Sequence, residues 1–238
     1  MAFRALVASI ASRLLVRFPR TRVLGLGFLA GVSVLVIASW ILGMLAEDVA
    51  DGEAFSHVDL IVGRWVLAHE PGWMPRAAFI VSRMHDTLAI LAYVGALGIY
   101  LLLKRQAGCV RWLLLSVPGG MFVNFLEKLA FHRARPDFGH GIETVSTYSF
   151  PSGHAAAATL LYGWLALYLT RNKGWRPRML AYATAAVSSV VVALSRMALG
   201  VHFLTDVLAA FAGAIAWLAL AAAFLMSENG ERDSRGGG

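Results

Sequence analysis

The chain has 238 residues, of which 58% are hydrophobic and 15% are charged, and its formal net charge is +7. Ordinary soluble domains are close to half apolar and a quarter charged, so this composition excludes a typical soluble protein and indicates an integral membrane protein. The basic residues lie in short segments beside apolar runs, a pattern that sets membrane orientation and argues against a nucleic-acid-binding face.

Six apolar segments are each roughly long enough to cross a hydrocarbon core of about 30 Å as a helix. They cover residues 23–46, 84–103, 112–131, 153–170, 179–195 and 203–227. The sequence therefore predicts an all-α, polytopic membrane protein with six transmembrane helices. We favour a retained signal anchor over a cleaved signal peptide, because the first segment exceeds the roughly 7–15 apolar residues of a cleaved peptide.

The six-helix membrane domain is expected to span residues 23–227, with one polar or amphipathic segment before it and one after it. Residues 1–22 predict a basic, amphipathic cytoplasmic leader, and residues 228–238 a disordered cytoplasmic tail. The outer loop, residues 47–83, contains an amphipathic stretch expected at the membrane interface. Pro118-Gly119-Gly120 predicts a kink in the third crossing, with neighbouring helices satisfying the freed carbonyl.

The distribution of lysine and arginine predicts the orientation of the chain. Six crossings place both termini on one side, and that side receives fourteen of the 21 basic residues. By the positive-inside rule it is the cytoplasm. The loop after the third crossing, the start of the fourth and the turn between the fifth and sixth then share the extracytoplasmic face.

The first polar cluster lies where the third apolar segment ends. Lys128 is placed at the end of that helix, and Arg135 follows beside Pro136, which biases Arg135 towards an extended backbone. The helix end and the loop can therefore direct two cations at one point. Alternatively, both side chains extend to lipid phosphates, as basic residues at helix ends commonly do.

The second cluster, Pro151-Ser152-Gly153-His154, opens the fourth apolar segment. Ser152 suits an N-cap, and Gly153 allows the backbone to approach a ligand closely. Free amides and the positive end of the helix dipole favour an anion there, and His154 projects from the first turn. The alternative is a capped helix with an interfacial histidine.

The third cluster, Ser195-Arg196 followed by His202 and Asp206, spans the turn between the last two segments. His202 and Asp206 are four residues apart at a helix start and therefore share a face. The carboxylate can hold one imidazole nitrogen and leave the other basic, while Arg196 adds a planar donor for phosphate oxygens. The alternative is a structural Arg–Asp–His network that ties two helices together.

Together the three clusters predict a site for phosphoryl transfer. This reaction needs stabilisation of charge on the phosphoryl oxygens, which cations and amides can supply without a metal. The sequence has no Cys/His cluster, HExxH spacing or carboxylate cage, and its lone cysteine, Cys109, excludes an internal disulfide. We therefore expect neither a metal nor a cofactor.

These clusters resemble the three-part signature of the type 2 phosphatidic acid phosphatase (lipid phosphate phosphatase) superfamily, in its integral membrane branch. They match it as Lys128-x6-Arg135-Pro136, Pro151-Ser152-Gly153-His154 and Ser195-Arg196-x5-His202-x3-Asp206. The resemblance implies that His202 is the nucleophile and forms a phosphohistidine, that Asp206 orients it, and that His154 is the general acid and base. It also implies that the phosphoryl oxygens are bound by Lys128, Arg135, Ser152, Gly153 and Arg196.

The sequence thus predicts a metal-independent phosphatase that hydrolyses a membrane lipid phosphate or diphosphate, of the polyprenyl diphosphate, phosphatidate or phosphatidylglycerophosphate type. The alternatives are a lipid phosphotransferase that uses the same phosphohistidine, and a non-enzymatic lipid-phosphate binder or flippase. The expected partners are the lipid substrate and the bilayer, not nucleic acid, and the sequence makes no prediction of oligomeric state. The expected location is the cell (inner) membrane, with the site on the periplasmic or extracytoplasmic side.

Other ionisable residues near the clusters have less defined roles. His132 is expected to be an interfacial histidine, and Glu127 to pair with a nearby cation. His85 and Asp86 are expected to begin the second crossing, and a position facing the site is the less favoured alternative for them. Residues 137–150, which include His140 and Glu143, are the candidate for headgroup selection from their position.

Overall fold

The computed structural model describes residues 22–51, 55–138 and 147–235, and all regular elements among them are helices. These are α2 (Arg22–Asp51), α3 (Phe55–His69), α4 (Met74–Met84), α5 (Thr87–Leu103), α6 (Ala107–Phe131), α7 (Gly153–Thr170), α8 (Trp175–Ala198) and α9 (Leu204–Arg235). The predicted leader, apart from Arg22, lies outside the described residues, as do His140 and Glu143.

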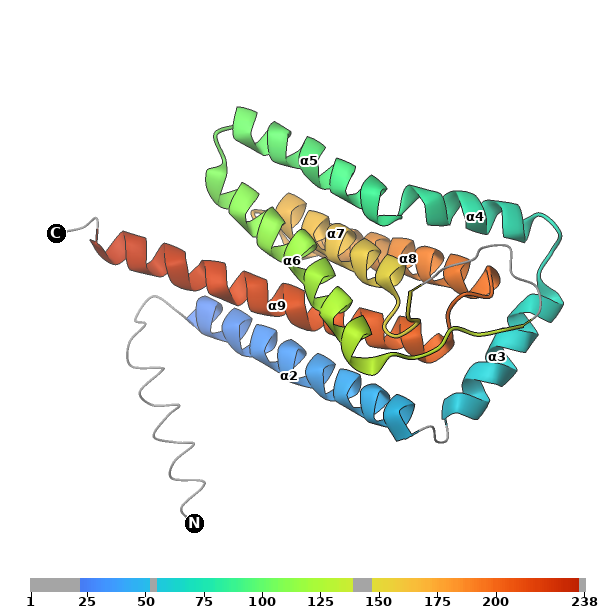
Figure 1. The fold of residues 1–238 in the computed structure, drawn as a ribbon. Coiled ribbons are helices and arrows are strands. Elements are labelled where there is room, and N and C mark those ends of the chain that lie inside the picture. Colours follow the sequence, from blue (N-terminus) through green and yellow to red (C-terminus); the bar gives the residue numbers. More distant parts are fainter. Residues whose placement is uncertain (1–21, 52–54, 139–146, 236–238) are drawn as a thin grey trace, which may run out of the picture.

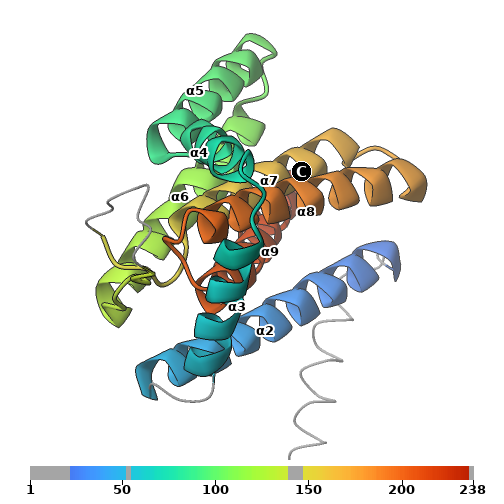
Figure 2. The ribbon, with the colours of Figure 1, turned by 90° about the vertical axis from the view of Figure 1, so that its right-hand side faces the viewer.

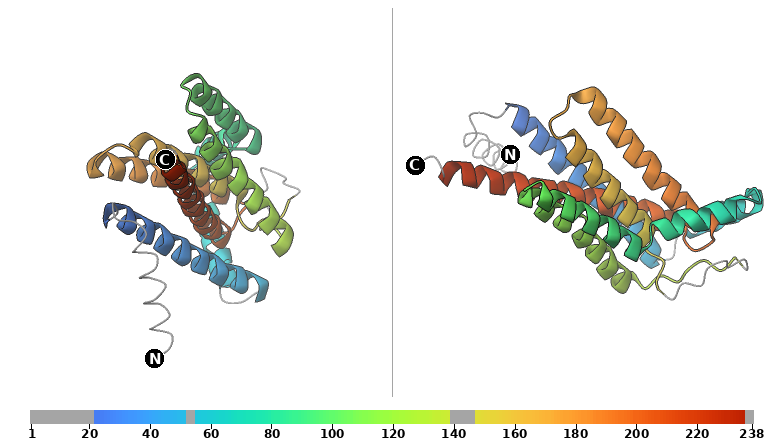
Figure 3. Two further views of the ribbon diagram at one scale, coloured as in Figure 1. Left: turned by 90° about the vertical axis from the view of Figure 1, so that its left-hand side faces the viewer. Right: turned by 90° about the horizontal axis from the view of Figure 1, so that it is seen from above.

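The long helices run along one direction, and α3 lies across one end of them (Figure 1). Seen along its length, α9 occupies the middle of the assembly, with α2, α6 and the α7–α8 pair around it (Figure 3). Helix α9 is apolar and rich in alanine, and its first half is mostly buried. Small side chains allow helices to approach closely within a membrane, which explains why α9 can contact so many neighbours.

Each of the six apolar segments coincides with a helix, which confirms the all-helical prediction for the described residues. Length and hydropathy alone qualify α6, α8 and residues Leu204–Ala222 of α9 as membrane spans. Helices α4 and α5 together qualify as a fourth span, bent by 47° at the break between them. Pro118 lies inside α6, and Trp217 of α9 donates a hydrogen bond to the nearby Leu115 carbonyl at 2.9 Å.

Several helix boundaries differ from the hydropathy pattern by three to eight residues, and two of them have a clear physical reason. The second predicted crossing starts at Met84, but α4 ends there and α5 starts at Thr87, because the Asp86 carboxylate caps α5 by accepting the Ala89 amide at 2.9 Å. At the other end, α9 continues to Arg235, past the predicted end at Ser227. Extending an existing helix costs less than starting one, so loss of hydropathy does not by itself end a helix.

Helices α6, α7 and α9 meet in a tightly packed core. The core cluster includes Val117, Leu160 and Leu218, all nearly inaccessible to solvent. A Cβ atom at Gly120 would lie 2.6 Å from a methyl group of Leu160 and 2.7 Å from the Trp217 ring. The absence of a side chain at this position therefore sets how closely the three helices approach.

We expect Gly120→Val to destabilise the protein by about 1–3 kcal/mol, because the added side chain overpacks the contact between α6, α7 and α9. Thermal unfolding in detergent micelles measures the effect. Gly95→Val on α5 is the matched control, because a Cβ there meets nothing within 4 Å. Equal unfolding temperatures for the two variants would contradict this account of the core.

Candidate functional site

The three predicted clusters converge at the end of the helices that α3 crosses (Figures 1 and 2). The amide of Ser152 donates a hydrogen bond to the backbone carbonyl of Asp206 at 2.9 Å, which joins the start of α7 to the first turn of α9. Arg135 lies against His202, with Nη1 3.1 Å from Nε2. Residues that are far apart in the sequence therefore form one site.

His202 lies in the buried turn between α8 and α9, only 3% exposed. Its Nδ1 is 3.3 Å from Oδ2 of Asp206, which also accepts the Phe203 amide at 2.9 Å. The carboxylate therefore holds the proton on Nδ1, and Nε2 accepts from Arg135. Burial lowers the pKa of His202 to about 3, so the imidazole is neutral near pH 7 and keeps a lone pair on Nε2.

Ser152 occupies the N-cap position of α7, as predicted, but its side chain makes no capping hydrogen bond. The buried hydroxyl has no partner among the described residues. A Cβ atom at Gly153 would lie 3.6 Å from both Lys128 Cε and Asn124 Oδ1. The start of α7 thus presents a hydroxyl and a bare backbone to the space beside Lys128.

Lys128 and Arg135 contact backbone carbonyls of the segment that precedes α7. Lys128 Nζ donates to Tyr148 O at 2.8 Å, and Arg135 Nε donates to Thr147 O at 2.7 Å. Arg135 Nη1 also donates to Val201 O at 2.8 Å, beside His202. The two cations therefore order the chain around the site as well as contributing positive charge to it.

Ser82 of α4 is a site residue that the sequence did not reveal. Its hydroxyl accepts a hydrogen bond from Nη1 of Arg196 and lies 3.5 Å from Nε2 of His154. Ser82 and Arg196 are each 1% exposed. The sequence offered only a serine near the end of the outer loop, outside its predicted amphipathic stretch, and most serines in such loops have no part in a functional site.

Arg133 and Asp59 were also missed. Arg133 Nη1 donates to Oδ1 of Asp206 at 2.6 Å, and its Nη2 donates to Oδ2 of Asp59 on α3 at 2.8 Å. Both carboxylates are buried. Arg133 lies between the two basic positions of the first cluster, so the sequence offered no way to separate it from an ordinary interfacial arginine.

The residues with less defined roles have other contacts. His132 ends α6 with φ 50° and packs edge-on against the Tyr148 ring, and His85 bonds to the Tyr162 hydroxyl at 2.6 Å. Asp86 caps α5. A Cβ at Gly213 of α9 would lie 3.6 Å from a Glu127 carboxylate oxygen, so Glu127 faces α9, and no cation partner for it appears among the described residues.

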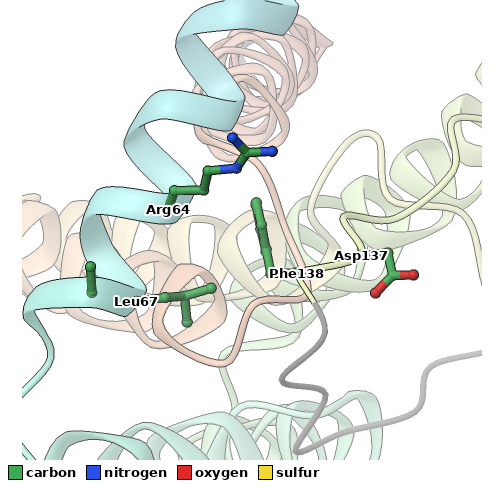
Figure 4. A pocket seen from close by; sticks show the side chains of 5 residues that line it. Arg64, Leu67, Asp137 and Phe138 are labelled. Carbon is green, nitrogen blue, oxygen red and sulfur yellow. The ribbon is translucent and has the colours of Figure 1, made fainter.

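A pocket of about 290 Å³ lies beside the site, between α3 and the chain that follows α6. Its lining residues are Arg64, Leu67, Ala68, Asp137 and Phe138. Arg64 and Leu67 project from α3 towards Phe138 (Figure 4). The Phe138 ring also packs against Phe203, with centroids 6.2 Å apart, which places the pocket next to the turn that carries His202.

A family model, the PAP2 superfamily, matches residues 109–229. Phosphatidylglycerophosphatase B of Bacillus subtilis (strain 168) is 30% identical over 148 residues, which are 61% of this chain and 72% of that protein. The crystal structure of a transmembrane PAP2 type phosphatidylglycerolphosphate phosphatase from Bacillus subtilis aligns with a TM-score of 0.72 at 25% identity, covering 80% of this chain and 94% of that chain. Aquifex aeolicus LpxE shares the fold, with a TM-score of 0.51 at 16% identity over 71% of this chain and 95% of that one.

The fold, the apolar helices and these matches define a membrane lipid phosphatase, an enzyme that hydrolyses phosphate monoesters. The chain belongs to the PAP2 superfamily. The resemblance seen in the three clusters is thereby confirmed.

We expect Ser82→Ala to lower kcat/KM for a lipid phosphate by about 10- to 100-fold, because a lost hydrogen bond to a charged group costs about 1.5–3 kcal/mol. The substitution removes the hydroxyl that contacts both Arg196 and His154. Phosphate release in mixed micelles measures the change. Ser189→Ala is the control, because the buried Ser189 hydroxyl donates a hydrogen bond within its own helix, to Ala185 O. Equal activity of the two variants would contradict a role for Ser82 in the site.

Proposed function

We propose that this protein removes the phosphate from a lipid phosphate monoester through a covalent phosphohistidine on His202. The observation that carries the proposal is the orientation of the buried imidazole. Its Nδ1 faces the Asp206 carboxylate, and its Nε2 faces Arg135. An imidazole held in this way is neutral, has a defined tautomer and presents one lone pair to a bound phosphorus atom.

In the first step, Nε2 of His202 attacks phosphorus as the bond from phosphorus to the lipid oxygen breaks. His154 gives its proton to the departing oxygen, so the lipid leaves as a neutral alcohol. Asp206 stabilises the imidazolium character that develops on His202. In the second step, His154 takes a proton from water, the water oxygen attacks phosphorus, and the phosphorus–nitrogen bond breaks to release phosphate.

The phosphoryl oxygens are stabilised in this mechanism by positive charge and fixed donors. We assign this role to Lys128, Arg135, Ser152, the Gly153 amide and Arg196. The Ser152 hydroxyl, which has no partner in the described part of the chain, and the α7 N-terminus support the assignment, because such groups bind anions without reorganisation. Arg135 would exchange its contact with Nε2 for a phosphoryl oxygen when substrate binds. These groups supply the charge stabilisation that a metal would otherwise provide, so we propose a metal-independent reaction.

For the substrate we propose a lipid of the phosphatidylglycerophosphate type. The names of the Bacillus relatives support this choice over phosphatidate and polyprenyl diphosphate, which remain the competing substrates. The pocket between α3 and Phe138 adjoins the His202 turn and offers room for the polar headgroup beyond the phosphate. A phosphotransferase that passes the phosphoryl group to another lipid is the second candidate, distinguished by whether labelled phosphate appears free or on an acceptor.

We further propose that α2, α5, α6, α7, α8 and α9 all cross the cell membrane, with both termini in the cytoplasm and the site at the outer leaflet. Lysine and arginine counts support this orientation. Exposed apolar side chains along α5, α6 and α8 are suited to lipid contact. In this arrangement α3, with the exposed Trp65 in its second half, lies at the outer interface where aromatic residues are favoured.

His202→Ala is expected to abolish phosphate release while the protein still folds, because the substitution removes the proposed nucleophile. Release is measured from four purified lipids: phosphatidylglycerophosphate, phosphatidate, diacylglycerol diphosphate and a polyprenyl diphosphate. Excess chelator should leave wild-type activity unchanged. His69→Ala, a histidine at the end of α3, is the control. Near-normal turnover by His202→Ala would refute the phosphohistidine mechanism.

The proposed orientation predicts opposite labelling at the two ends of α6. In a Cys109→Ser background, which removes the single native cysteine, His132→Cys should react with a membrane-impermeant maleimide on intact spheroplasts. Lys104→Cys, just before α6, should react only after the membrane is opened. Both positions are exposed, so accessibility within the protein is matched. The reverse labelling pattern would contradict the proposed orientation and indicate that the site faces the cytoplasm.

A further inference from the structure

Asp59 is a buried carboxylate that lies outside the residues matched by the family model. It belongs to α3 and is 1% exposed. A charge so fully removed from water is costly unless it is paired and hydrogen-bonded. Its contacts therefore indicate what holds it there.

Asp59 binds the first turn of α9 and Arg133 at the same time. One oxygen accepts the Thr205 amide at 3.0 Å, and the other accepts the Thr205 hydroxyl and Nη2 of Arg133, the latter at 2.8 Å. The Thr205 amide is in the first turn of its helix, where amides lack intrahelical acceptors and carry the positive end of the helix dipole. Asp59 thus caps α9 from another helix.

Arg133 in turn connects Asp59 to Asp206. Its Nη1 donates to Oδ1 of Asp206 at 2.6 Å and to the Thr205 hydroxyl at 2.7 Å, and its guanidinium lies over the Phe203 ring at 4.4 Å. The planar guanidinium is therefore fixed by two carboxylates, a hydroxyl and an aromatic face. This geometry leaves it little freedom to rotate.

The two oxygens of Asp206 have separate partners as a result. Oδ1 is held by Arg133, while Oδ2 accepts the Phe203 amide and faces Nδ1 of His202. If Oδ1 were released, the carboxylate could rotate, and its hydrogen bond would no longer hold the imidazole of His202 in one orientation. The orientation of the imidazole therefore depends on a chain of contacts that begins on α3.

We propose that Asp59 is a positioning residue: acting through Arg133, it fixes the Asp206 carboxylate and so aims His202 at the phosphorus atom. This inference rests on the proposed function of His202. It assigns α3 a part in the reaction, although none of the residues proposed to bind the phosphate lies on α3. Asp59 and Arg133 act on orientation, so the inference concerns the rate of the chemical step and not substrate binding.

The test compares steady-state phosphate release by wild-type protein, Asp59→Asn, Thr205→Val and Arg133→Met, together with the Asp59→Asn/Arg133→Met double variant. We expect Asp59→Asn to lower kcat by about 10- to 100-fold, as misplacement of a reacting group does. KM should change by less than about twofold, since the loss is confined to the transition state. Thr205→Val, which removes the shared hydroxyl without changing size, should act in the same direction.

The double variant separates positioning from general stability. If Asp59 acts only through Arg133, its substitution should have no further effect on kcat in the Arg133→Met background. Asp86→Asn is the control, since this carboxylate caps α5 and asparagine can cap equally. Thermal unfolding and size-exclusion profiles show which variants fold. If Asp59→Asn does not fold, the kcat of Thr205→Val tests the inference in its place.

A folded Asp59→Asn variant with kcat within about twofold of wild type would overturn the inference. So would independent, multiplying effects of Asp59→Asn and Arg133→Met, or a loss that appears only in KM. Failure of the proposed function is distinguishable from these outcomes. In that case wild-type protein would release no phosphate, or His202→Ala would remain active, whatever the behaviour of Asp59.

Discussion

The site depends on one buried carboxylate, that of Asp206. It is fully inaccessible to solvent at the start of a membrane helix, where an unpaired charge costs several kcal/mol. Arg133, the Phe203 amide and the Nδ1–H of His202 together compensate this charge. The backbone carbonyl of the same residue accepts the Ser152 amide, so the position of Asp206 also determines where α7 begins.

This arrangement explains why the groups proposed to react lie at helix ends. Helices α6, α8 and α9, which are long and apolar enough to cross a membrane, satisfy their own backbone groups along their length, as membrane helices must. Their ends are where amides and carbonyls become available and where lysine and arginine side chains can reach them. Lys128, Arg135 and Arg196 each lie at the end of a helix or just beyond it, and the Ser152 hydroxyl is placed by the start of α7.

The sequence predicted the helices well, because apolar length is a strong constraint in a membrane and each segment was long. It predicted the family because three clusters with fixed internal spacing rarely occur together by chance. It missed Ser82, Asp59 and Arg133, whose roles depend on contacts between residues more than seventy positions apart along the chain. A lone serine, aspartate or arginine carries no spacing signal, so only the packing of α3 and α4 against α8 and α9 reveals it.

The network around Asp206 also bears on how the enzyme balances stability against activity. Replacing a buried ion network by apolar side chains is often neutral or stabilising, so Asp59, Arg133 and Asp206 are poorly explained as a source of stability alone. Removing a single member is costly, since it leaves an uncompensated buried charge. What the network does provide is a fixed orientation of the side chains: each oxygen of Asp206 has its own donors, and the imidazole of His202 has one orientation. The proposed reaction requires one imidazole nitrogen to face a phosphorus atom, so it needs that fixed orientation more than it needs additional folding energy.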